Sequence, residues 1–145
     1  MNQQDATVSE FPGPGRSLSV FCRKCAIELL IVFGSRARGI TAPSSDIDLA
    51  VQLKKGLEVS KLDLLYELGA VFHPEPIDLV ILTPNTTPLL RYEIFFRGQV
   101  LFEEFEGLFE RGKLKAWKLY LDTAHLRRLE LEYLRAFVKR MRHVT

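Results

Sequence analysis

The chain has 145 residues, of which 47% are hydrophobic, and this is enough apolar material for the core of one compact domain. Its net charge of +2 is too small to indicate a direct nucleic-acid partner. No run approaches the ~20 apolar residues of a membrane span, so we expect no membrane contact. Residues 1–17 are polar and lack the apolar core of a signal peptide. We expect them to be a disordered tail ahead of a single domain over 18–145.

Helical and strand patterns alternate along the rest of the chain. Strands are expected at 29–33, 46–51, 76–82 and 99–103, and helices at 18–28, from 35, at 56–70, at 88–97 and from 105 onward, with a break near Gly112. Thr87 is expected to cap the helix that starts at Pro88, and Gly98 to end it. This order predicts the α/β (α+β) class, a small mixed β-sheet with helices packed on one side and a long C-terminal helical segment.

Two cysteines, Cys22 and Cys25, form a C-x-x-C within the first expected helix. A zinc site would need a second pair of ligands, and a thioredoxin-like motif would need to follow a strand. We interpret the two as reduced, partly buried thiols, which suits a cytoplasmic protein.

Asp46-Ile47-Asp48 leads into an apolar run and is the first candidate functional motif. Residues i and i+2 of a strand point to the same face, so both carboxylates would be presented at one place while Ile47 points into the core. Two carboxylates this close repel each other, and a divalent cation with oxygen ligands removes that repulsion. The motif therefore predicts a Mg²⁺ site beside a phosphate substrate.

A Gly-Ser pair, Gly34-Ser35, lies ten residues before this motif and directly after an apolar strand. Gly34 allows the backbone to approach a ligand closely. A helix opening at Ser35 would direct free N–H groups at an anion. Arg36 and Arg38 add charge for phosphate oxygens. No P-loop or dinucleotide-binding pattern is present, so the segment predicts a nucleotide-phosphate site of another kind.

Asp78 is a third acid, embedded in the apolar run 76–82. An unpaired carboxylate in such a run is costly, so Asp78 is expected to face Asp46 and Asp48. There it would help to hold one or two metal ions or accept a proton from an attacking hydroxyl.

These motifs resemble the nucleotidyltransferase superfamily that includes DNA polymerase β. Within it, the chain is similar to the minimal nucleotidyltransferases (MNT proteins), the antitoxin halves of HEPN/MNT toxin–antitoxin pairs. The segments that carry this similarity are FGSRARG…SDIDLAV and the later PLLRYEIFFRGQVLFE. The resemblance covers roughly residues 18–105. It implies Mg²⁺-dependent transfer of AMP from ATP, with a tyrosine of a HEPN toxin as acceptor and with assembly into homo- or hetero-oligomers. By this resemblance the catalytic and metal-binding residues are Asp46, Asp48 and Asp78, and the nucleotide-binding residues are Gly34, Ser35, Arg36 and Arg38.

Other interpretations stay open. A D-x-D alone is common on solvated strand edges, and Arg36 and Arg38 could form a solvated helix face. The protein could also bind nucleotide without turnover and neutralise its partner by docking, or it could transfer a nucleotide to a small molecule.

The last expected helix carries apolar residues at three- and four-residue spacing, from Leu126 to Met141. Packing on the chain's own core would explain such a stripe. However, one helix from Phe105 to Met141 would run ~55 Å, longer than a domain of this size. We therefore expect its far end to project and to serve as a partner-binding surface.

Overall fold

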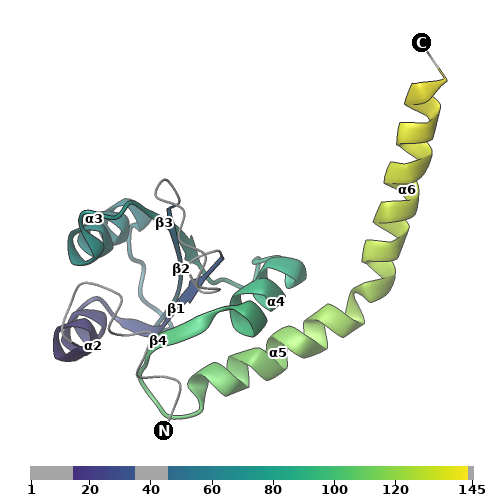
Figure 1. Ribbon diagram of the computed structural model, residues 1–145. Helices are drawn as coiled ribbons and strands as arrows, with labels where there is room; N and C mark the ends of the chain where they lie inside the picture. Colours follow the sequence, from purple (N-terminus) through teal and green to yellow (C-terminus); the bar gives the residue numbers. More distant parts are fainter. Residues whose placement is uncertain (1–14, 35–45, 144–145) are drawn as a thin grey trace, which may run out of the picture.

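The computed structural model describes residues 15–34 and 46–143 and shows a four-stranded sheet flanked by helices (Figure 1). The strands are β1 (Ile27–Phe33), β2 (Ile47–Leu53), β3 (Ile77–Ile81) and β4 (Gln99–Glu103), and the helices are α2 (Gly15–Lys24), α3 (Lys61–Phe72), α4 (Pro88–Arg97), α5 (Leu108–Asp122) and α6 (Ala124–Arg142). The sheet order is β3-β2-β1-β4. β1 is antiparallel to both neighbours and β2 is parallel to β3, so the predicted mixed sheet and α+β class are confirmed.

The central strand β1 is apolar on both faces over Leu29–Phe33, because a strand covered on both sides needs core residues on each face. Alternate residues of β1 therefore enter two separate cores. Leu30 and Val32 join α2 and α3 on one face, through residues such as Cys22 and Leu68. Leu29 and Ile31 join α4 and α5 on the other, through residues such as Phe95 and Ala116.

The prediction that the helices pack on one side of the sheet is therefore wrong. Figure 1 shows α2 and α3 on one side of the strands and α4 and α5 on the other. The pattern that reveals this is the unbroken apolar run Leu29–Phe33 of β1, which a one-sided sheet would replace by alternation with polar residues.

Several element boundaries differ from the prediction. The first helix ends at Lys24 instead of residue 28, because Ala26 has a positive φ of 58° and Ile27 already belongs to β1. The helix expected from residue 56 begins at Lys61, since Gly56 has a φ of +84° that a helix cannot continue. The helix expected from Ser35 and most of the expected tail lie outside the described residues.

The prediction for α4 is confirmed at both ends. The Thr87 hydroxyl accepts a hydrogen bond from the backbone N–H of Leu90 at 3.3 Å, Pro88 is the first helical residue, and Gly98 ends the helix.

The break in the C-terminal helical segment lies at Thr123 and not near Gly112, so that expectation is wrong. Gly112 lies inside α5, where a Cβ would contact the Phe95 ring. The glycine there permits close packing between α5 and α4. At Thr123 the side-chain hydroxyl donates to the carbonyl of Leu119 at 2.7 Å, and the backbone leaves the helical conformation. Hydroxyl bonds to the preceding turn compete with the helical pattern and bend or end helices.

Across the described residues, no helix is both long and apolar enough to cross a membrane. Cys22 is buried and Cys25 is half-buried, and both are free thiols, as predicted. Burial raises the pKa of the Cys22 thiol to about 12, so it stays protonated and inert.

Candidate active site

The carboxylates meet at the end of the sheet where β1 finishes and β2 and β3 begin. Asp48 is the second residue of β2 and Asp78 the second residue of β3. The two are partners in the parallel register, so their side chains emerge from neighbouring strands on the same face. Ile47 and Leu49, on either side of Asp48, are buried in the opposite core, as predicted. This alternation directs Asp48 toward the face that α4 covers.

Asp46 precedes β2 by one residue and is exposed, as is Asp78, whereas Asp48 is half-buried. Burial raises the pKa of the Asp48 carboxyl above its ordinary value, and the negative charges of Asp78 and then Asp46 raise it further. The sequence-predicted acids are thus close enough for both neighbours to repel the Asp48 charge. A positive charge bound among them would relieve that repulsion.

Gly34 follows β1 directly and packs against the Asp48 side chain. Its φ of +73° lies in the left-handed region that glycine adopts without strain. A Cβ at this position would lie 3.1 Å from Cγ of Asp48 and closer still to its Oδ2. Gly34 is therefore required for two independent reasons, its backbone conformation and the space that the Asp48 carboxylate occupies.

Two further residues at this end of the sheet were not singled out from the sequence. Phe33 pairs directly opposite Asp48 across β1 and β2, so the two side chains lie on the same face of the sheet. Gln99 opens β4 in register with Val32, one residue from Phe33. A polar residue that begins an apolar strand was the available signal for Gln99, while the signal for Phe33 is only the pairing itself.

The remaining predicted nucleotide-binding residues, Ser35, Arg36 and Arg38, lie outside the described residues. Their roles stay predictions. What the structure does describe is where their segment departs, at Gly34, and where it returns, at Asp46, on both sides of the half-buried Asp48 carboxylate.

The donor set suits magnesium that arrives with a nucleotide. Among residues 15–34 and 46–143, no three acidic, histidine or cysteine side chains converge closely enough to make a complete metal site by themselves. Magnesium in phosphate-handling enzymes is usually held by one or two carboxylates together with substrate oxygens. Asp48 with one neighbouring carboxylate meets that requirement. Burial is the main cause of the raised pKa of Asp48, and a bound cation would remove the further contribution from the charges of Asp78 and Asp46.

The sequence model of the family described as Polymerase beta, Nucleotidyltransferase matches residues 18–106. The chain belongs to this nucleotidyltransferase family. The match spans the sheet, all three acids and the Gly-Ser pair, and it stops just before α5. The expected superfamily is thereby confirmed, and with it a nucleotidyltransferase as the class of protein.

Several solved structures share this fold. A chain in a crystal structure of a toxin–antitoxin with AMP-PNP superimposes with a TM-score of 0.70 at 21% identity, covering 84% of this chain and 98% of that one. A chain in the structure of a tri-AMPylated HEPN toxin in complex with MNT antitoxin, from Shewanella oneidensis, gives 0.64 at 20% identity, covering 83% and 94%. A chain of the toxin–antitoxin MntA–HepT gives 0.63 at 20% identity, covering 83% and 95%.

At these identities the likeness establishes a shared fold. It extends over most of both chains, so the expected nucleotidyltransferase fold is confirmed. A comparison with curated protein sequences gives no match.

Proposed function

We propose that this protein transfers AMP from ATP to a hydroxyl group, in a Mg²⁺-dependent reaction, and that the acceptor is a tyrosine of a HEPN-type toxin that it neutralises. One observation carries the proposal. Gly34, directly after β1, packs against Asp48 of β2, and Asp48 is in register with Asp78 of β3. Their mutual repulsion has no evident role in folding, but it prepares the site for a cation and a phosphate.

The proposed chemistry assigns one task to each group. Asp46 and Asp48 would hold Mg²⁺ together with phosphate oxygens, and the ion would supply Lewis-acid polarisation of the α-phosphate. The acceptor hydroxyl oxygen forms a bond to the α-phosphorus while the bond from that phosphorus to the bridging oxygen breaks, and pyrophosphate leaves. Asp78, exposed beside Asp48, receives the hydroxyl proton or completes the metal ligands. Gly34 lets the β1 end approach the phosphates, and Ser35, Arg36 and Arg38 hold the outer ones.

The proposed acceptor is supported by the partners found in similar structures. The three structures compared above are toxin–antitoxin complexes, and the toxin in one of them is tri-AMPylated. A protein hydroxyl on such a partner fits an exposed site at the edge of a small domain. The free thiols Cys22 and Cys25 agree with the cytoplasm as the compartment.

A second function, neutralisation by docking without turnover, is favoured by one specific observation. Helix α6 exposes its whole apolar stripe, which is suited to binding a partner whether or not AMP is transferred. Docking alone, however, gives no reason to place carboxylates against one another at Gly34.

The test is the intact mass of the protein encoded by the neighbouring gene after incubation with this protein, ATP and Mg²⁺. We expect the wild type to add adenylyl groups and Asp48→Asn to lower the rate by at least about 100-fold, because a metal ligand is lost. Asp48→Asn also removes charge repulsion, so its melting temperature should equal or exceed that of the wild type. Asp122→Asn, a matched change at an exposed position on α5, should transfer normally.

Transfer by Asp48→Asn at the wild-type rate would overturn the metal assignment. Absence of transfer by the wild type, together with intact neutralisation of the partner by Asp48→Asn, would favour the docking function instead.

A further inference from the structure

Helix α6 contributes nothing to either core. None of its 19 residues is buried, whereas α5, which precedes it, buries Phe109 and Ala116. Eight large apolar side chains of α6 have between 47% and 65% of their surface exposed: Leu126, Leu129, Leu131, Tyr133, Leu134, Phe137, Val138 and Met141. A helix that projects from the domain with this much apolar surface indicates a binding site (Figure 1).

A basic edge runs along one side of this apolar face. Leu131, Leu134 and Val138 recur at helical spacing and form the floor of a shallow groove of about 520 Å³, and Arg135, Lys139 and Arg142 line it beside them. Over its full length α6 carries six Arg or Lys side chains and two Glu, an excess of four positive charges. The apolar row and the positive row are thus parallel along the helix axis.

The junction that carries α6 is built to hold it at a fixed angle. The Arg127 guanidinium donates to the Thr123 hydroxyl at 2.7 Å and to the Tyr120 carbonyl at 2.6 Å. It also stacks on the Tyr120 ring, 3.8 Å from the centroid. Tyr120 stacks in turn on Tyr92 of α4, with 4.2 Å between ring centroids. A preorganised helix loses less freedom on binding than a mobile one does.

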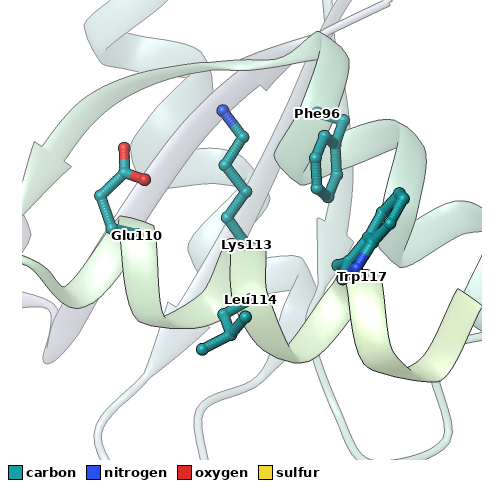
Figure 2. A pocket seen from close by; sticks show the side chains of 5 residues that line it. All are labelled: Phe96, Glu110, Lys113, Leu114 and Trp117. Atoms are coloured by element: carbon teal, nitrogen blue, oxygen red, sulfur yellow. The ribbon is translucent and has the colours of Figure 1, made fainter.

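Further aromatic contacts hold α5, from which α6 extends, against α4. Within α4, the ring centroids of Tyr92 and Phe96 are 4.5 Å apart, and the ring centroid of Trp117 on α5 lies 6.0 Å from that of Phe96. Figure 2 shows Phe96 and Trp117 close together above α5, while Leu114 points away from α4. Lys113 covers the Phe96 ring at 5.2 Å. The aromatic contacts hold α5 against α4, so that α6 extends from a rigid support.

We infer that the apolar face and basic edge of α6 are the docking surface for the protein acceptor of AMP, and that this acceptor presents an apolar strip bordered by carboxylates. The inference rests on the proposed function for the identity of the partner. Charge decides between this partner and a second copy of the chain. Two α6 helices packed together would join surfaces that each carry an excess of four positive charges, whereas an acidic border would neutralise them.

The position of α6 also separates docking from chemistry. The helix is about 28 Å long and extends from the C-terminal end of α5, whereas Asp48 and Asp78 lie at the end of the sheet. An acceptor bound along α6 leaves the carboxylates accessible, so it can be held there while one of its hydroxyls reaches the site. Docking therefore raises the local concentration of the acceptor, and loss of docking should raise KM more than it lowers kcat.

The experiment measures binding of the neighbouring gene's protein by calorimetry, and AMP transfer to it by intact mass, with the full chain. The double variant Leu134→Gln, Phe137→Gln removes apolar surface while keeping good helix formers. We expect its Kd and its KM to rise at least tenfold, with kcat within about twofold of the wild type and an unchanged melting temperature. The control is Glu132→Gln, which lies opposite the apolar face of α6 and removes no apolar surface, so it should bind no more weakly than the wild type does.

Charge reversal tests the basic edge separately. Arg135→Glu should weaken binding severalfold and more at low salt than at high salt. Lys118→Glu, an equal charge change at an exposed position on α5, is the matched control and should have no comparable effect.

Normal binding and normal KM in both α6 variants would overturn the inference even if transfer by the wild type proceeds. A wild type that binds through α6 without transferring AMP would contradict the proposed function and leave the surface in place. A concentration-dependent dimer of the chain alone, abolished by Leu134→Gln, Phe137→Gln, would show that a second copy is the occupant and would also overturn it.

Discussion

The carboxylate end of the sheet and the C-terminal helix α6 differ most in how far their side chains are buried. Around Asp48 the chain is so tightly packed that Gly34 has no room for a Cβ, and the neighbouring residues Ile47 and Leu49 are fully buried. In α6 no side chain is buried at all. The first region needs the fold in order to function. The second needs only its own helix and the junction at Thr123.

This difference shows where stability and recognition reside in the molecule. Charges that repel each other can be held together only by a rigid surrounding, so the acids are placed on buried strands. A surface that must bind another protein has to remain uncovered in the monomer, so it is placed beyond the core. Changes in one region should leave the other unaffected, and the following predictions test that separation.

The largest effect is expected from truncation after Leu121, which removes α6 and its junction. The cores retain Phe109 and Ala116 of α5, so the product should be soluble and folded, with a melting temperature within a few degrees of the full chain. Partner binding should fall by more than about 100-fold, since several exposed apolar side chains are lost together. Circular dichroism and calorimetry measure the two outcomes. An insoluble or unfolded product would assign the stripe to the chain's own core and remove the contrast between the regions.

A smaller effect is expected from Gly34→Ala, with Gly56→Ala as a matched control. Both glycines have positive φ, +73° and +84°, so each substitution costs about 1–2 kcal/mol of backbone strain. Only at Gly34 does the added Cβ meet another group, the Asp48 carboxylate, while Gly56 has nothing within 4 Å.

Both variants should therefore lose similar stability from strain, but AMP transfer should fall ~10- to 100-fold only in Gly34→Ala, because displacement of a metal ligand by about 1 Å is costly. Equal transfer rates in the two variants would mean that the close packing at Asp48 has no catalytic role. Melting curves and initial rates of acceptor labelling provide the measurements.

Much of this separation could be predicted from the sequence. The four strands, the capped helix α4 and the alignment of Asp48 with Asp78 all follow from short-range signals: apolar runs, a Thr-Pro start and an acid embedded in a strand. The exposed stripe of α6 also follows from spacing and length. The strands, the helix cap and the stripe could be predicted because each depends on residues within a few positions of one another, whereas the meeting of Asp48 and Asp78 was inferred from the cost of an unpaired acid in an apolar run.

What could not be predicted depends on residues far apart in the sequence. Helices on both faces of the sheet follow from how two runs of β1 residues divide between two cores. The position of Phe33 beside Asp48 exists only through strand pairing. Gly112 was interpreted as a helix break because glycine disfavours helices, but its absent side chain instead makes room for Phe95, seventeen residues earlier.

The smallest effects are expected within α5, the helix that joins the core to α6. Gly112→Ala adds a Cβ that would overlap the Phe95 ring, nearest to Cε1 and 2.6 Å from Cζ, and Phe95 is itself fully packed with 1% exposure. Overpacking of this kind costs about 1–3 kcal/mol, and the gain in helix propensity returns up to ~1 kcal/mol. Gly69→Ala, inside α3 with open space around it, gains the same propensity without the overlap.

We therefore expect Gly112→Ala to lower the free energy of unfolding by about 1 kcal/mol and Gly69→Ala to raise it by about 0.5–1 kcal/mol, as measured by urea denaturation. Partner binding should be normal in both, because α6 begins beyond the last turn that contacts the core. Stabilisation by Gly112→Ala would show that Phe95 can move aside and that α5 is held less tightly on α4 than the aromatic contacts indicate. In that case α5 and α6 would move relative to α4, and only the Arg127 junction would hold α6 at a fixed angle to α5.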